Sequence, residues 1–498
     1  MRSIRLGALL VIAAACLRPM QAAVAAGFGP DAYPIPAGDL DGDGFRDVIV
    51  SAGGQSETAT VTALKGTDGS TLWSSSTAIP GDDAWNMAYP LPLGPAGEPG
   101  VLVVAGRSVG DSRALHLTAL GSGGTQIWRR SVTGSIAFGV PIFYNVLHAN
   151  GAADDVLIGR VSRSESLELI TAAVVAGEDG SVGGRAVALG GRTTAAVIGD
   201  VSRDGLDDYA LLSTGQAIGA PAMRLTAHRG TDGGPLWTAA LPGDADAVMR
   251  PVPDATGDTY GEVAVWTAPT YPETPNLRLL DGRDGGTRWV KTVKHLAAIG
   301  DVNGDGRAEI LTANDTYQPG PLVTAELRFE AVQGTGATLY STVHTVSFPL
   351  GGSAPCADFG PAGDAGADAG AGPDVRYQVY SDCRYRSPAQ GGVVRGSDGS
   401  VAWFKPVAGD ALAASVDGAG DDLATFAPAG GSTTVTVSDG ADGSTVWMGT
   451  APGAYLGSVR TGVAVDLDGD GRAEVLPLIF GGPVTALRGT NGSILWTR

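Results

Sequence analysis

The chain has 498 residues, with 33 Lys and Arg against 52 Asp and Glu, for a net charge of −19. This balance excludes nucleic acid as the expected partner, because binding it requires basic patches. The length exceeds one ordinary compact domain unless the fold is a ring or solenoid of repeats. The 76 Gly and few aromatic residues favour short strands joined by tight turns.

The first 25 residues have the pattern of an export signal. Arg2 and Arg5 precede an apolar run that is too short to span a bilayer, and small residues follow it. Cleavage after Ala25 would leave a mature chain of residues 26–498. The alternative is a lipoprotein signal that ends before Cys16. We expect a secreted, extracellular or periplasmic protein, lipid-anchored in the second case, and no transmembrane segment in the mature chain.

An acidic stretch, GDLDGDGFRDVIV, starts at Gly38 and runs into a strand-like apolar segment. Acids stand at its alternate positions, a Gly follows at the sixth position of the loop, and another acid closes it at the ninth. In a tight turn such side chains converge on one point, and this number of hard oxygens suits Ca²⁺ better than Mg²⁺. The predicted ligands are Asp39, Asp41, Asp43, the Phe45 carbonyl and Asp47.

The same pattern returns along the chain, in register with a longer repeat. A solvated acidic turn is the alternative, but it does not explain acids and amides at alternate positions with Gly sixth. Without an ion the carboxylates repel one another, so we expect several structural Ca²⁺ ions. The predicted ligands are Asp200, Ser202, Asp204, the Leu206 carbonyl and Asp208; Asp301, Asn303, Asp305, the Arg307 carbonyl and Glu309; and Asp466, Asp468, Asp470, the Arg472 carbonyl and Glu474. A weaker loop offers Asp254, Thr256, Asp258 and Glu262, with Thr259 where Gly is expected.

A second repeated pattern, such as ALKGTDGSTLW, ends in Trp and recurs about every fifty residues. Four strands per unit of this length predict the blade of a β-propeller. The GTDG-like segments are hairpin turns, and the large rings are expected to pack blade against blade. We predict an all-β propeller over residues 26–498; nine repeats are counted, and seven to nine blades remain open. The copies end at Trp73, Trp128, Trp237, Trp289, Trp403, Trp447 and Trp496, with weaker copies at Tyr340 and Gly184.

Both patterns resemble known families. The acidic loops resemble the FG-GAP (VCBS) repeats of integrin α-subunit propellers. The Trp-ending turns resemble the tryptophan-docking motif of quinoprotein propellers, with Ala63, Gly69 and Trp73 in the matching positions. Both resemblances imply a propeller, and neither fixes a function; a binding, cell-adhesion or scaffold module is the expectation.

Cys356 and Cys383 are the two Cys of the mature chain. They flank the low-complexity segment 364–374, and an antiparallel hairpin around that segment would bring them nearly opposite each other. An exported protein would oxidise such a pair, so we predict a disulfide.

No catalytic or organic-cofactor residues are predicted. GRSVG at 106–110 matches a nucleophile-elbow pattern, but that elbow needs a helix after its strand, and at this place another strand is expected. The five His residues are scattered singly. We therefore expect a calcium-stabilised module that binds a protein or glycan. The alternative is a carbohydrate-active or quinone-dependent enzyme on the same scaffold.

Overall fold

The computed structural model describes residues 33–52, 58–78, 82–109, 112–135, 140–147, 153–163, 168–190, 192–214, 223–242, 246–268, 275–318, 322–349, 355–363, 373–382, 387–407, 409–416, 422–453, 462–479 and 482–498. The predicted signal segment 1–25, with Cys16, lies outside these residues, and so does Cys383. Within the described residues every regular element is a β-strand. None of them forms a helix long and apolar enough to cross a membrane.

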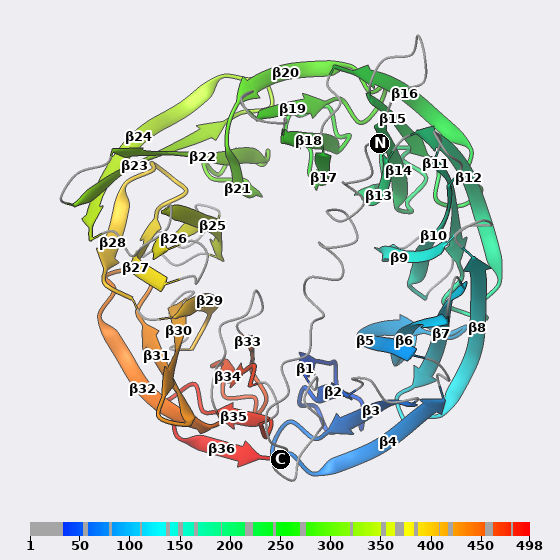
Figure 1. Ribbon diagram of the computed structural model, residues 1–498, viewed down its shortest axis with the longest axis horizontal. Helices are drawn as coiled ribbons and strands as arrows, with labels where there is room; N and C mark the ends of the chain where they lie inside the picture. Colours follow the sequence, from blue (N-terminus) through cyan, green and yellow to red (C-terminus); the bar gives the residue numbers. More distant parts are fainter. Residues whose placement is uncertain are drawn as a thin grey trace, which may run out of the picture.

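The strands form nine separate four-stranded antiparallel sheets that stand side by side in a ring around a central axis (Figure 1). In each sheet the strands follow chain order from the axis to the rim. The chain is therefore a nine-bladed β-propeller. This confirms the predicted all-β fold and settles the blade number that the repeats left open.

Each blade has four strands, and this order places the first two nearest the central axis. The first, innermost strands are β1 (Tyr33–Pro36), β5 (Asp82–Leu93), β9 (Val140–Leu147), β13 (Arg192–Gly199), β17 (Asp246–Val252), β21 (His295–Gly300), β25 (Cys356–Gly363), β29 (Asp410–Ala414) and β33 (Gly462–Val465). The second strands are β2 (Val48–Ala52), β6 (Glu98–Val109), β10 (Asp155–Arg163), β14 (Asp208–Thr214), β18 (Glu262–Ala268), β22 (Glu309–Gln318), β26 (Asp374–Asp382), β30 (Asp422–Ala429) and β34 (Glu474–Pro477).

The two outer positions complete each blade. The third strands are β3 (Thr58–Leu64), β7 (Ser112–Gly121), β11 (Glu168–Val175), β15 (Met223–His228), β19 (Asn276–Leu280), β23 (Val323–Val332), β27 (Ser387–Val394), β31 (Ser432–Ser438) and β35 (Thr485–Leu487). The rim strands are β4 (Thr71–Ala78), β8 (Gln126–Ser135), β12 (Val182–Gly190), β16 (Pro235–Leu241), β20 (Thr287–Thr292), β24 (Thr338–Phe348), β28 (Val401–Lys405), β32 (Thr445–Pro452) and β36 (Ile494–Thr497).

The hydrophobic core is divided into clusters that lie between neighbouring blades. In β2, Val48 and Val50 pack towards blade 9, while Ile49 packs towards blade 2. Side chains of a strand alternate between the two faces of its sheet, and both faces of a blade are covered by neighbours. The second strands therefore read as continuous apolar runs, such as VIVSA.

The ring closes without any strand shared between the two ends of the chain, because β33 to β36 pair only with one another. Blade 9 instead packs on blade 1 through side chains. Trp496 joins a buried cluster with Val48, Val50 and Leu64, and its Nε1 donates to the Gly66 carbonyl at 2.6 Å. We call this joint the seam.

The repeated aromatic residues pack at the blade interfaces, as predicted. Each ring covers a Gly with positive φ in a turn of the next blade, so close that a Cβ on that Gly would clash. The pairs are Trp73 on Gly124, Trp128 on Gly180, Trp237 on Gly285, Trp289 on Gly336, Tyr340 on Gly399, Trp403 on Gly443, Trp447 on Gly492 and Trp496 on Gly69. In blade 3 the sequence has Gly184 at this position.

Candidate metal centres

The five acidic loops all connect the first strand of a blade to its second. We name them by blade: loop 1 (39–47), loop 4 (200–208), loop 5 (254–262), loop 6 (301–309) and loop 9 (466–474). Because successive strands run in opposite directions, these loops lie on the same face of the ring as the turns that receive the Trp rings. Loops 4, 5 and 6 occupy consecutive blades, and loops 9 and 1 meet at the seam.

All five loops have the same backbone conformation. Their fourth and sixth residues have positive φ, as for Gly42 (79°) and Gly44 (91°) in loop 1. Among the described residues, two that are not Gly have positive φ, and both hold these positions: Arg203 (62°) and Thr259 (73°). The degenerate loop 5 therefore folds like the others, although Thr is disfavoured in this region of backbone space.

The first Asp of each loop organises the turn by accepting backbone amides. Asp39 accepts from Gly42 at 2.6 Å and from Gly44 at 2.8 Å, one on each carboxylate oxygen. The fifth residue then accepts the amide of the seventh, as Asp43 does from Phe45 at 2.9 Å. In loop 4, Asp200 accepts from the Asp204 and Gly205 amides, one on each oxygen, at 3.1 and 2.9 Å. In the remaining loops the contacts of Asp39 are repeated by Asp254, Asp301 and Asp466. The contact of Asp43 is repeated by Asp204, Asp258, Asp305 and Asp470.

This fold brings several predicted ligands together. Carboxylate oxygens come within 4.8 Å of one another in three groups. The donors are hard oxygens, the kind that Ca²⁺ prefers. In loops 4 and 6 the third residue is neutral, Ser202 or Asn303, and contributes a hydroxyl or an amide. The groups are Asp39, Asp41 and Asp43; Asp254, Asp258 and Glu262; and Asp466, Asp468 and Glu474.

A cationic side chain already lies against loop 1. The Lys65 ammonium is 3.2 Å from Asp41 and 2.7 Å from Asp43, and it holds the pKa of Asp43 below its ordinary value. In loop 9 Arg488 stands in the same place, 3.3 Å from Asp468. The two loops with an acid in the third position thus each have a nearby cation, whose position shows where positive charge is stabilised.

The closing acids have a second contact that the sequence did not reveal. Asp47 is fully buried and accepts from the Leu40 amide at 2.7 Å and the Gly66 amide at 3.2 Å. The carbonyl of Gly66 in turn accepts from Trp496 of the neighbouring blade. The Asp47 carboxylate therefore connects its loop, through the single turn residue Gly66, to the Trp ring that docks from the preceding blade of the ring.

The same connection occurs in blades without an acidic loop. In blade 3 Asp155 accepts from the Gly177 amide at 2.9 Å, and the Gly177 carbonyl accepts from Trp128 at 2.7 Å. In blade 8 Asp422 holds a turn that receives Trp403 in the same way. The closing acid is thus needed by the blade itself, and its presence alone does not indicate a metal.

Burial shifts the protonation of the closing acids. It raises the pKa of Asp208 to about 6, and the pKa values of Glu262 and Glu474 to about 7, against the opposing effect of their amide donors. It also raises the pKa values of Asp47 and Glu309. A nearby divalent cation would favour the ionised form of each.

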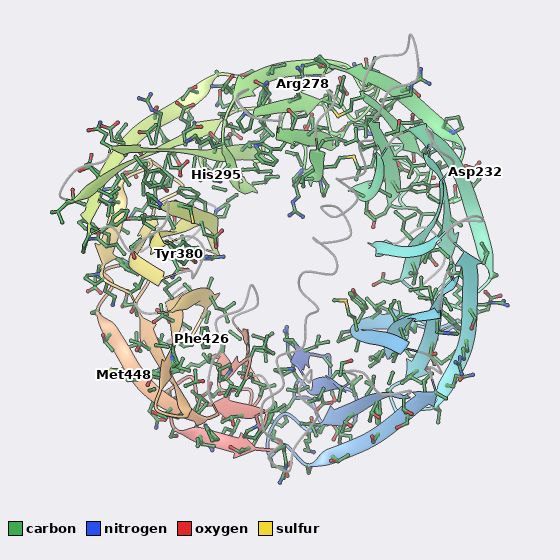
Figure 2. All side chains as sticks on the ribbon, viewed as in Figure 1. Asp232, Arg278, His295, Tyr380, Phe426 and Met448 are labelled. Atoms are coloured by element: carbon green, nitrogen blue, oxygen red, sulfur yellow. The ribbon has the colours of Figure 1, made fainter. Side chains whose placement is uncertain are left out.

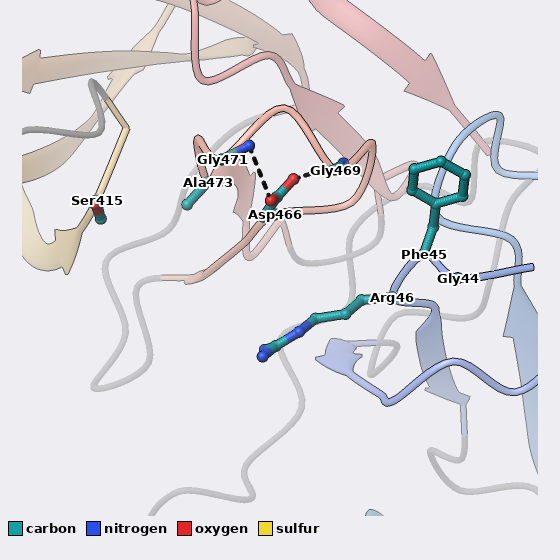
Figure 3. A pocket seen from close by; sticks show the side chains of 8 residues that line it. All are labelled: Gly44, Phe45, Arg46, Ser415, Asp466, Gly469, Gly471 and Ala473. Carbon is teal, nitrogen blue, oxygen red and sulfur yellow. Dashed lines mark hydrogen bonds between the residues drawn. The ribbon is translucent and has the colours of Figure 1, made fainter.

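A hollow of about 370 Å³ lies where loops 9 and 1 meet. Figure 3 shows Arg46 extending beside Asp466, whose carboxylate is held by the Gly469 and Gly471 amides. Phe45 packs against Gly469, so loops 1 and 9 touch directly. Blade 8 contributes Ser415 to the wall.

The other predicted residues fall as follows. β25 and β26 form the expected hairpin, with Cys356 opposite Tyr380, and Cys356 is disulfide-bonded. Its predicted partner Cys383 is outside the described residues, so that pairing stays a prediction. Ser108 of GRSVG pairs with Arg113 of the next strand, so the helix that a nucleophile elbow needs does not follow it.

Comparison with known proteins adds little beyond the fold. No family model and no curated protein matches the chain. Among solved structures it is similar to the Bacillus licheniformis rhamnogalacturonan lyase PL11, at 13% identity over 95% of this chain and 76% of that one, with a TM-score of 0.36. It is also similar to Saccharomyces cerevisiae Sqt1 (10%, 81% and 93%, TM-score 0.38) and Moraxella catarrhalis BamB (13%, 68% and 92%, TM-score 0.30). At these scores the likeness carries no argument about function, and the class that the structure defines is a nine-bladed β-propeller with four-stranded blades.

Proposed function

We propose that this protein is an exported, calcium-stabilised binding propeller of the FG-GAP type, which presents one face of its ring to a protein or glycan. The observation that carries the proposal is the repeated loop conformation, which gathers oxygen donors at the same place in several blades. The ions would be structural. The predicted ligands of loops 1, 4, 6 and 9 would hold them.

The proposed ions would act on more than their own loops. In loops 1 and 9 the closing acid also holds the turn on which a neighbouring Trp docks. An ion that fixes the loop would therefore stabilise two blade joints through Asp47 and Glu474. An ion present at a hundredfold excess over its dissociation constant contributes about 2.7 kcal/mol per site.

The hollow at the seam is the proposed contact point for the ligand. It is lined by two candidate metal loops and by Arg46, which is exposed. A guanidinium group pairs well with carboxylate or sulfate groups, so acidic glycans are suitable first probes. An ordered pair of loops would keep the hollow in one shape for binding.

Retention on a glycan array, in Ca²⁺ and then in chelator, tests the proposal. We expect retention of the full chain in Ca²⁺, loss in chelator, and a weaker signal for Arg46→Ala. Arg224→Ala, an exposed arginine on β15, is the matched control and should bind as wild type. Binding that ignores both Ca²⁺ and Arg46 would contradict the proposal.

A second candidate, an enzyme on the same scaffold, has one cluster in its favour. Buried Asp315 lies 3.2 Å from both His295 and Lys294, and Figure 2 labels His295 at β21. Burial alone would raise the pKa of Asp315, but the hydrogen bond with His295 and the nearby Lys294 ammonium hold it below its ordinary value. An Asp that orients a half-exposed His is an arrangement used in proton transfer.

That cluster lies away from the acidic loops, because His295 begins β21 and loop 6 follows the end of that strand. Turnover of polysaccharides, or activity after reconstitution with a quinone, would favour the enzyme. Loss of that turnover in His295→Ala would assign it to this cluster. The absence of turnover together with glycan retention would favour the binding module.

A further inference from the structure

Loop 5 differs from the other candidate metal loops in what surrounds it. Its carboxylates, Asp254, Asp258 and Glu262, are close enough to hold an ion. Their oxygens accept hydrogen bonds within the loop, as those of the other loops do, and in loop 5 a guanidinium group is added to them. Asp258 accepts the Tyr260 amide on Oδ1 at 3.0 Å and the Arg288 guanidinium on Oδ2 at 2.9 Å.

The closing acid of loop 5 is occupied in the same way. Glu262 is fully buried, and it accepts from the Ala255 amide at 2.8 Å and from the Thr256 hydroxyl at 2.9 Å. Both of its oxygens are therefore used inside the loop. Asp254 likewise accepts amides on each oxygen, from Gly257 and Thr259.

Three guanidinium groups from three blades lie around loop 5. Arg288 comes from β20 of the same blade and also contacts Asp281. Arg203 reaches over from loop 4, 4.1 Å above the Tyr260 ring and 3.4 Å from the Asp258 carbonyl. Arg307 comes from loop 6 and lies on Gly257 so closely that a Cβ there would clash with its guanidinium.

The backbone of Arg203 supports the importance of these contacts. It has positive φ at a position where the other four loops have Gly. A residue with a Cβ is disfavoured there, and it persists where the surrounding structure fixes it. The contacts of Arg203 with Asp258 and Tyr260 of loop 5 stabilise this disfavoured backbone conformation.

The other loops have fewer positive charges beside them than the three around loop 5, with one cation each at loops 1 and 9. Lys65 and Arg488 each reach loops 1 and 9 from a partly exposed position. Among the described residues, no Lys or Arg forms an ion pair with the predicted ligand carboxylates of loops 4 or 6. At loop 5, Arg288 pairs directly with the Asp258 carboxylate, and Arg203 and Arg307 add two positive charges against its backbone and the Tyr260 ring. Three positive charges at one loop offset its three carboxylates without an ion, and guanidinium is well suited to carboxylate pairing.

We propose that loop 5 holds no Ca²⁺, and that Arg203, Arg288 and Arg307 together take the place of the ion and join loops 4, 5 and 6 into one rigid arc. The inference rests on the proposed calcium sites for its contrast with the other loops. It deepens that proposal by assigning the weaker candidates Asp254, Thr256, Asp258 and Glu262 to a different role.

The number of bound ions tests the first half of the inference. Isothermal titration of the full chain with Ca²⁺ should give four sites, and Asp258→Asn should leave four. The matched control is Asp305→Asn, at the same position of loop 6, which should leave three. Five sites in the wild type, falling to four in Asp258→Asn, would overturn the inference and leave the calcium proposal standing.

A double-mutant cycle tests the second half without any metal. In chelator, Arg288→Gln should lower the urea midpoint of unfolding more in the wild type than in the Asp258→Asn background, where only its contact with Asp281 is lost. Equal shifts of the urea midpoint in both backgrounds would overturn the proposal that Arg288 holds loop 5 through Asp258. If no ion binds to any variant, the calcium proposal fails, and this cycle still decides whether guanidinium groups hold loop 5.

Discussion

Replacing Trp496 by Ala should open the ring at the seam. The side chain is buried, packs on Gly69 and donates to the Gly66 carbonyl. Truncating a buried Trp to Ala removes about 3–5 kcal/mol of stability. The loss falls on the joint between blades 9 and 1, which are not consecutive in the chain. This joint consists of side-chain packing and of Arg498, which donates to the Gly69 carbonyl at 2.8 Å and to the Asp68 carbonyl at 3.2 Å.

Hydrogen exchange with mass spectrometry can locate the opening. In Trp496→Ala, amides of β2, β3, β34 and β35 should exchange faster, while those of blade 5 keep their protection. Trp447→Ala is the matched control, since Trp447 makes the same contact between blades 8 and 9, where the chain itself keeps the blades close. The reasoning is refuted if both variants change the same amides to the same extent, or if Trp496→Ala lowers stability by no more than a surface substitution does.

Three further outcomes follow from the structure. Chelating Ca²⁺ should lower the melting temperature by scanning calorimetry, by an amount that Mg²⁺ restores poorly; an unchanged melting temperature would remove the structural role of the ions. Gly285→Ala should cost more than about 1 kcal/mol in urea unfolding, because a Cβ there would lie 2.5 Å from the Trp237 ring at φ +73°; Gly123→Ala, with no atom within 4 Å, should be nearly neutral. Burial lowers the pKa of His228, so at this residue the unfolded chain binds a proton first as pH falls below about 6.5. The raised pKa values of Asp208, Glu262 and Glu474 act in the opposite direction, so the test is the difference between two chains: from about pH 7 to about pH 5.5 the wild type should lose stability relative to His228→Asn, whereas parallel stability curves would refute a role for His228.

The fold was predictable because the same sequence pattern recurs in successive blades. A Trp or a related residue recurs once per blade, and each such ring has the same task of covering a turn Gly in the next blade. The count of nine repeats matches the nine blades, although the weak copy at Gly184, which has no aromatic ring, left the blade number open between seven and nine. Ring closure uses the same Trp-on-Gly contact as the other joints, Trp496 on Gly69, but the repeat does not indicate that its last copy meets its first.

The loop conformation was also predictable, down to the Gly at the sixth position. The backbone conformation and the surroundings of the degenerate loop 5 were not predictable from the sequence. Thr259 departs from the pattern in sequence but adopts the backbone of Gly in the structure. The guanidinium groups that distinguish loop 5 come from residues 203, 288 and 307, which lie far apart in the chain and converge only after the blades assemble. The second contact of Asp47 was missed for the same reason, because Gly66 belongs to another turn.

Because each blade consists of one uninterrupted segment, its hydrogen bonds can be completed before the rest of the chain exists. During synthesis or export, four strands can pair as soon as they emerge, and each finished sheet offers an apolar flank on which the following one can condense. Only ring closure, in which blade 9 packs on blade 1, requires residues from opposite ends of the polypeptide. Until then, the first and final sheets each have one side bare to solvent, which makes the open arc the species most exposed to misassembly and to capture by folding helpers.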